Sequence, residues 1–205
     1  MKKLFGIICF VVMTGFTLAQ TPQEIISRME TELDKHESEG IIMTLDVKVP
    51  ILGTMTTKTY TLGNKTRADA VIMGADIVTW TDGKTSWKYN AKKNEVEISR
   101  LENETTPEDD TEMFNGITDD YNVSINKETE NTWTLICKKS KSNKDKDAPK
   151  KMELVVTKGT FMPVSLKTKL SGMKITMRDI SFGVTEKQVT FNAKDYPGVT
   201  IVDKR

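Results

Sequence analysis

Short runs of alternating apolar and polar residues dominate the chain after its first 40 residues. A first run begins after Gly40. Its apolar residues Ile41, Met43, Leu45 and Val47 alternate with mostly polar ones, as in a half-buried strand. Ten further segments show the same pattern, namely 54–62, 65–73, 76–81, 85–90, 95–101, 121–127, 132–138, 151–157, 163–170 and 174–182. Turn residues separate several of them. The pattern predicts a mainly β (α+β) protein with one antiparallel sheet, curled into a barrel or an open half-barrel covered by other elements.

Two segments show a helical pattern instead. Residues 22–39 begin with Thr21 as a cap and Pro22 in the first turn, and carry the apolar stripe Ile25, Ile26, Met29 and Leu33. Residues 107–117 follow an acidic start and predict a short helix with a small apolar face. Residues 140–150, dense in Lys, Asp and Ser, predict a solvated loop. Both helices need an apolar surface to cover.

The amino terminus has the features of an export signal. Lys2 and Lys3 precede an apolar run that ends in Thr17-Leu18-Ala19, which predicts cleavage after Ala19. The alternative is a membrane anchor, but the run is interrupted by small and polar residues and is short for a span of about 20 apolar residues. We therefore expect a signal peptide at 1–19, a single domain at 20–205, and a periplasmic protein.

The charge balance argues against one class of partner. The chain has 30 basic and 29 acidic residues, and loss of Lys2 and Lys3 leaves 28 basic ones, so the expected mature chain has a net charge of −1. Nucleic-acid binding, which needs a basic excess, is not expected. Cys137 is the only cysteine after residue 19, which excludes an intramolecular disulfide in the mature chain.

The sequence offers no catalytic constellation. His36 is the only histidine, which excludes a histidine-based triad and a multi-histidine metal site. Phosphate loops, nucleophile elbows and zinc motifs are absent, and the acidic run 102–112 lacks the spacing of a calcium loop. We predict no catalytic residue, cofactor or metal, although a cleft that holds two carboxylates remains a minor alternative. The predicted mature chain does contain nine methionines, whose pliable side chains suit an irregular apolar ligand or an ordinary core.

One hairpin and the carboxy end resemble a known family. Asp82-Gly83-Lys84, followed by Trp87 and Tyr89, is similar to the Asp-Gly-Lys-x-x-Trp-x-Tyr hairpin of the periplasmic outer-membrane lipoprotein carrier (LolA-like) family, and the tail 191–203 with its Pro-Gly-Val is similar as well. The resemblance covers the whole predicted mature chain. It implies an open, strongly curved sheet closed by helices that act as a lid over a hydrophobic cavity.

The same resemblance implies a role and partners. It implies a monomeric carrier that takes acylated lipoproteins or lipids from an inner-membrane release complex and passes them to an outer-membrane acceptor. The alternative is a lipid-binding, sensor or interaction module on the same scaffold, not an enzyme. In the family an arginine before a proline on an early strand holds the lid shut. Here the region reads Lys65-Thr66-Arg67-Ala68 without the proline, so Arg67 is the candidate lid lock, with Lys65 behind it.

The alternation and the second helix supply candidate residues for the cavity. They are Leu45, Val47, Val78, Trp80, Trp87, Tyr89, Val96, Ile98, Met113, Phe114, Ile117, Leu154, Val156, Val164 and Leu166. Which face of each strand points inward is open, because a shift of one residue reverses it. Trp87 and Tyr89 are expected to share a face, as are Val78 and Trp80.

Overall fold

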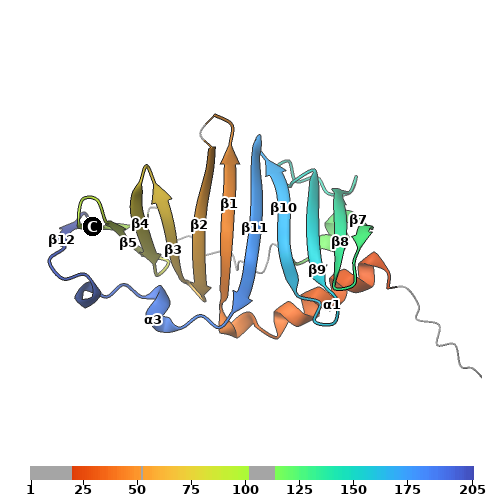
Figure 1. The fold of residues 1–205 in the computed structure, drawn as a ribbon, viewed down its shortest axis with the longest axis horizontal. Coiled ribbons are helices and arrows are strands. Elements are labelled where there is room, and N and C mark those ends of the chain that lie inside the picture. Colours follow the sequence, from red (N-terminus) through yellow and green to blue (C-terminus); the bar gives the residue numbers. More distant parts are fainter. Residues whose placement is uncertain (1–19, 52, 102–113) are drawn as a thin grey trace, which may run out of the picture.

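The computed structural model describes residues 20–51, 53–101 and 114–205, and most of them belong to one curved, unclosed sheet (Figure 1). The strand order is β12-β6-β5-β4-β3-β2-β1-β11-β10-β9-β8-β7. The strands are β1 (Ile41–Val49), β2 (Gly53–Leu62), β3 (Lys65–Ile72), β4 (Ala75–Thr81), β5 (Thr85–Asn90), β6 (Glu95–Arg100), β7 (Tyr121–Glu128), β8 (Thr132–Lys139), β9 (Lys151–Thr157), β10 (Pro163–Leu170), β11 (Met173–Phe182) and β12 (Thr200–Asp203). The predicted mainly β, open half-barrel fold is confirmed.

The pairing departs from the predicted antiparallel sheet at one edge. β12 pairs with β6 in parallel, whereas the other described pairs are antiparallel. Hairpin turns make neighbours antiparallel, but β12 reaches β6 after a long return of the chain, so no turn fixes its direction.

The first helix, α1 (Pro22–Asp34), forms where the capping signals placed it. The Thr21 hydroxyl accepts from the Glu24 N–H at 3.2 Å, and the Thr21 N–H donates to the Glu24 carboxylate at 2.9 Å. This reciprocal pair satisfies two donors at the helix start. The helix is shorter than predicted, because a separate 3₁₀ turn (Glu37–Glu39) leads to Gly40.

Gly40 is required where the chain enters the sheet. Its φ is +70°, and a Cβ would lie 2.4 Å from the Thr61 carbonyl oxygen and 2.9 Å from the Val184 Cβ. A side chain there would clash with backbone as well as adopt a strained φ. The position also joins the two ends of the molecule, because the Val184 N–H donates to the Glu39 carbonyl at 2.8 Å.

The remaining helices are short. The segment from Phe114 leads into α2 (Ile117–Asp120), and α3 (Glu186–Val189) and a 3₁₀ turn (Ala193–Asp195) lie in the C-terminal segment, residues 183–199. Most of the predicted second helix, including Met113, lies outside the described residues. Within the described parts of the chain, no helix is long and apolar enough to cross a membrane.

Candidate functional site

One face of the sheet carries an aliphatic surface over β11, β10, β9 and β8. The register aligns one residue from each strand, in the order Met177, Leu166, Leu154 and Leu135. Leu45 of β1 pairs with Met177 and extends the same row. Paired residues share a face, so these side chains form one surface, which we call the α1 face. Leu135 and Leu154 are fully buried, and Leu166 is nearly so.

Helix α1 covers this surface. Ile25, Ile26, Met29 and Leu33 are at most 1% exposed and belong to one cluster with Leu135, Leu154 and Leu166. Phe114 and Ile117 join the same cluster and are also buried. The apolar stripe of α1 therefore has its whole partner surface on the α1 face.

Cys137 lies inside this cluster and is fully buried. Burial alone raises the pKa of its thiol to about 11. Since the thiolate is the reactive form, this thiol is protonated and unreactive at neutral pH while α1 stays in place. It is therefore a sensitive reporter of solvent access to the α1 face.

The opposite face carries aromatic side chains over β4 and β5. Trp80 pairs with Trp87, and Val78 pairs with Tyr89, so the two predicted shared faces are confirmed. The C-terminal segment packs over them: the Phe191 ring lies 5.4 Å from Trp80 and 6.1 Å from Trp87. Tyr196 adds a contact of 4.6 Å with Tyr89. We call this surface the tail face.

The predicted cavity residues are divided between the two faces. Five lie on the α1 face, namely Leu45, Val47, Leu154, Val156 and Leu166, and Phe114 and Ile117 pack in the same cluster. Six lie on the tail face, namely Val78, Trp80, Trp87, Tyr89, Val96 and Ile98. Val164 sits at a register shift between Pro163 and Ser165 and is 40% exposed. The expectation of one shared surface is therefore corrected.

The division has a simple cause in the strand pattern. In β1 the odd-numbered Leu45 and Val47 lie on the α1 face, while in β4 the even-numbered Val78 and Trp80 lie on the tail face. Register through β2 and β3 connects Leu45 with Ile77, on the opposite side from Trp80. Alternation marks an apolar face on each strand but does not say that neighbouring hairpins use the same one.

Arg67 and Lys65 lie on the tail face. The Arg67 guanidinium donates to both carboxylate oxygens of Asp69, at 2.7 and 2.9 Å, and lies 5.6 Å from the Trp80 ring. Lys65 forms a 2.8 Å ion pair with Glu186 of α3. Lys65 therefore ties β3 to the C-terminal segment, whereas Arg67 is held within β3 by Asp69. As candidate lid locks they are placed away from α1, because odd-numbered residues of β3 face the tail.

Two features of the site were not predicted. Phe191 and Tyr196 entered the sequence interpretation only through the family resemblance, although two aromatics in a segment without strand pattern are themselves a sign of packing. Glu30 of α1 has a buried carboxylate oxygen without a hydrogen-bond partner in the described structure. Desolvation raises the pKa of Glu30, opposed by the backbone N–H groups of Ile117 and Gly116. The position of Glu30 beside the apolar stripe residues Met29 and Leu33 could have predicted this partial burial.

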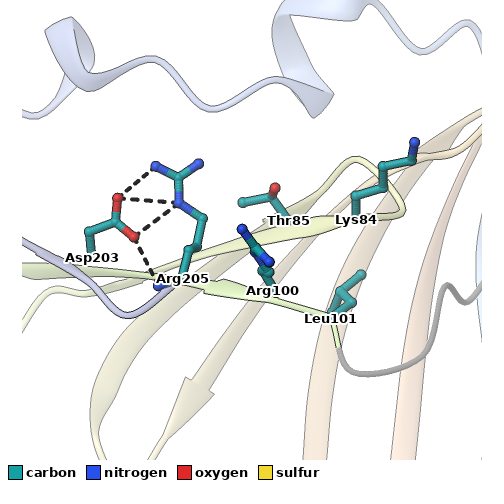
Figure 2. A pocket seen from close by; sticks show the side chains of 6 residues that line it. All are labelled: Lys84, Thr85, Arg100, Leu101, Asp203 and Arg205. Atoms are coloured by element: carbon teal, nitrogen blue, oxygen red, sulfur yellow. Dashed lines mark hydrogen bonds and ion pairs between the residues drawn. The ribbon is translucent and has the colours of Figure 1, made fainter.

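A basic pocket of about 680 Å³ lies at the far edge of the sheet, beside β12 (Figure 2). It is lined by Lys84, Thr85, Arg100, Leu101, Asp203 and Arg205. Arg205 holds the Asp203 carboxylate at 2.6 Å and lowers the pKa of that carboxyl to about 2. The pocket is polar and open, so it does not extend either apolar face. Among the described residues, no group of three or more His, Cys, Asp or Glu is placed to hold a metal ion.

Comparison with known proteins gives likenesses in structure only. No protein-family model matches the sequence, and no curated protein matches it. A LolA superfamily protein from Nitrosomonas europaea is similar at 12% identity, over 86% of this chain and 100% of that one, with a TM-score of 0.33. The lipoprotein LppX of Mycobacterium tuberculosis is similar at 10% identity, over 80% and 97%, with a TM-score of 0.49.

A third similar structure is an uncharacterized conserved protein from Thermus thermophilus, at 18% identity over 89% of this chain and 98% of that one, with a TM-score of 0.46. A LolA superfamily protein is among the structures to which this chain is similar. At these identities the likeness assigns neither a ligand nor a partner.

Proposed function

We propose that this protein is a periplasmic carrier that shelters the acyl chains of lipoproteins on the α1 face and ferries them from the inner to the outer membrane. The observation that carries the proposal is that an unclosed aliphatic sheet face is covered by one short helix, through four buried apolar side chains, together with Phe114 and Ile117. Movement of α1 would expose much of this surface.

The energies favour an exchange between helix and ligand. Full burial of a large apolar side chain is worth about 1.5–3 kcal/mol, so the four α1 side chains contribute roughly 6–12 kcal/mol. A saturated chain of about 15 methylenes gains a similar amount at about 0.8 kcal/mol for each methylene. Because the two terms are similar, an acyl chain can compete with α1 for the same surface, and a second protein can reverse the exchange.

The composition of the α1 face fits a disordered apolar ligand. Met29 and Met152 are buried in the cluster, and Met177 packs against it. Methionine side chains adjust to irregular shapes at little cost, as mobile acyl chains require. On this proposal the donor is an inner-membrane release complex, the acceptor lies in the outer membrane, and the carrier acts as a monomer.

The first test is the ligand content of the exported protein. We expect that protein expressed from the full-length chain, with its new amino terminus determined, carries acyl chains detectable by native mass spectrometry and lipid extraction. Co-expression with an acylated lipoprotein should give a one-to-one complex. A clean mass without lipid in both cases would favour an interaction module on the same scaffold.

The second test uses Cys137 as the reporter, with Cys9 replaced by serine. Palmitate should increase the rate at which a thiol reagent modifies Cys137, because binding displaces α1. A matched pair of variants locates the ligand: Val47→Asn on the α1 face should weaken palmitate binding, while Val78→Asn on the tail face should not. Both valines are half-buried strand residues. Equal loss in both variants would contradict the assignment to the α1 face.

A further inference from the structure

Five lysines form a row across five neighbouring strands. In the order β1, β11, β10, β9 and β8, they are Lys48, Lys174, Lys169, Lys151 and Lys138. Three of the four neighbouring lysine pairs are paired directly in the strand register. The fourth, Lys169 beside Lys151, follows from the pairing of Thr168 with Met152. All five side chains are exposed. With strands about 4.8 Å apart, this lysine row extends over roughly 20 Å.

The sheet does not neutralise this row. Like charges that face each other across strands are destabilising. In the next row of the same face, Lys167 pairs with Glu153 at 3.3 Å, and Arg178 pairs with Asp46 at 2.7 Å. No member of the lysine row has an ion pair with a described acidic residue. The uncompensated charge points to an anionic partner outside the chain.

A basic groove continues from the row. It has a volume of about 850 Å³ and lies between the ends of β9, β10 and β11 and the loop before β9. Its lining contains four further cations, against two acidic residues, Asp147 and Glu153; the cations are Lys139, Lys146, Lys150 and Lys167. Positive charge is therefore spread over a surface rather than gathered at one small anion site.

Exposed apolar side chains lie at the same end of the sheet. Among the described residues, seven large apolar side chains are exposed, and five belong to the hairpins β1–β2 and β3–β4: Ile51, Met55, Val71, Ile72 and Met73. Ile51 and Met73 are 105% and 97% exposed. Both turns lie along the upper edge in Figure 1, the edge to which Lys48 belongs. Clustered exposed apolar residues mark a contact surface.

We propose that this end of the sheet docks on a bilayer surface that contains anionic phospholipids, with the lysine row over the phosphates and the two hairpin tips among the headgroups. Lysines are compact, hydrated charges suited to such diffuse attraction, and a bilayer presents phosphates over the whole length of the row. Apolar tips beside cations match the layered polarity of the interface. Docking needs no movement of α1, so it stands apart from the acyl-chain proposal.

The test compares two triple variants of the exported protein by flotation with vesicles of phosphatidylcholine, alone or with about 30% phosphatidylglycerol. Lys48→Gln, Lys169→Gln and Lys174→Gln together remove three charges from the row. The control is Lys84→Gln, Lys127→Gln and Lys187→Gln, three exposed lysines away from the row. We expect binding to anionic vesicles, weakened on the order of a hundredfold by the row variant at low salt and unchanged by the control.

Further measurements distinguish docking on anionic lipids from other causes of binding. High salt, about 0.5 M, should release the wild-type protein because it screens exposed charges. Equal binding to neutral vesicles, equal loss in both triple variants, or selective capture of an acidic protein without vesicle binding would overturn the proposal. Unfolding in urea shows whether the row variant is folded, and palmitate-dependent labelling of Cys137 shows separately whether acyl binding persists.

Discussion

The two coverings of the sheet differ in how they are attached. On the tail face, the C-terminal segment is held by aromatic rings, by the Lys65–Glu186 ion pair and by the pairing of β12 with β6. On the α1 face, the helix is held mainly by its apolar stripe, with the Arg28 guanidinium 5.0 Å from the Phe161 ring and Glu30 beside the backbone N–H groups of Ile117 and Gly116. The comparison teaches that the tail covering depends largely on ring stacking, an ion pair and strand pairing, whereas the α1 covering depends largely on apolar burial, which scales with area and has no fixed direction.

The largest effect is expected from breaking the tail face. Trp80→Ala should lower the free energy of unfolding by about 3–5 kcal/mol, because Trp80 is 3% exposed and contacts Phe191 and Tyr196. Urea unfolding measures the loss. Trp80→Phe should keep part of the aromatic contact and lose less. A change below about 1 kcal/mol would mean that the tail is not fastened by these rings.

A substitution on the α1 face should cause a smaller loss of stability and should also make Cys137 more accessible. Met29→Ala should lower the free energy of unfolding by about 2–4 kcal/mol and accelerate thiol labelling of Cys137 in native buffer, since both lie in one cluster. Ser27→Ala, an exposed position of the same helix, is the control. Labelling that follows global unfolding alone would show that α1 does not open separately.

The helix cap offers a gentler way to loosen α1. Thr21→Ala removes the acceptor for the Glu24 N–H and should cost about 1 kcal/mol, with a modest increase in Cys137 labelling. Thr21→Asn retains a capping oxygen and should restore most of the stability. Identical labelling rates in the two variants would exclude a role for the cap in holding α1.

The smallest effect is expected from Glu30, and it depends on pH. The raised pKa means that the folded state binds this proton more tightly than the unfolded chain, so the ionised carboxylate lowers stability. That cost is absent well below the ordinary value of 4.5 and grows as the pH rises through the raised folded value.

Glu30→Gln should therefore raise the free energy of unfolding at pH 7, by up to about 1 kcal/mol, and leave it unchanged near pH 3.5. Urea unfolding at the two pH values measures both. Glu37→Gln, the same substitution at an exposed position shortly after α1, is the matched control. A stabilisation of equal size at both pH values would show that charge is not its cause.

Much of the fold was predictable because its signals are local. Alternation located β1 to β11, Thr21 and Pro22 located the start of α1, and the pairing of Trp80 with Trp87 followed from the hairpin. The short β12 was missed because its parallel pairing with β6 depends on a distant part of the chain.

The candidate site was less predictable, because it depends on relations between strands. Leu45 and Trp80 both belong to regular alternating runs, yet they face opposite sides of the sheet. Which side chains of a strand are covered depends on the element that packs on that half of the sheet. The strand sequences alone do not predict the position of α1 or of Phe191. The side of Arg67 and Lys65 was open for the same reason.

The junction at Gly40 restricts how α1 can leave the sheet. The chain after the helix is anchored there, since Val184 donates to the Glu39 carbonyl and the His36 ring stacks on Phe182 at 4.8 Å. At its other end α1 is capped by Thr21 and is held to the sheet by the buried side chains of Ile25 and Ile26. On the proposed carrier function, α1 would therefore open about its carboxyl end, because backbone hydrogen bonds at the Gly40 junction tie that end to the sheet.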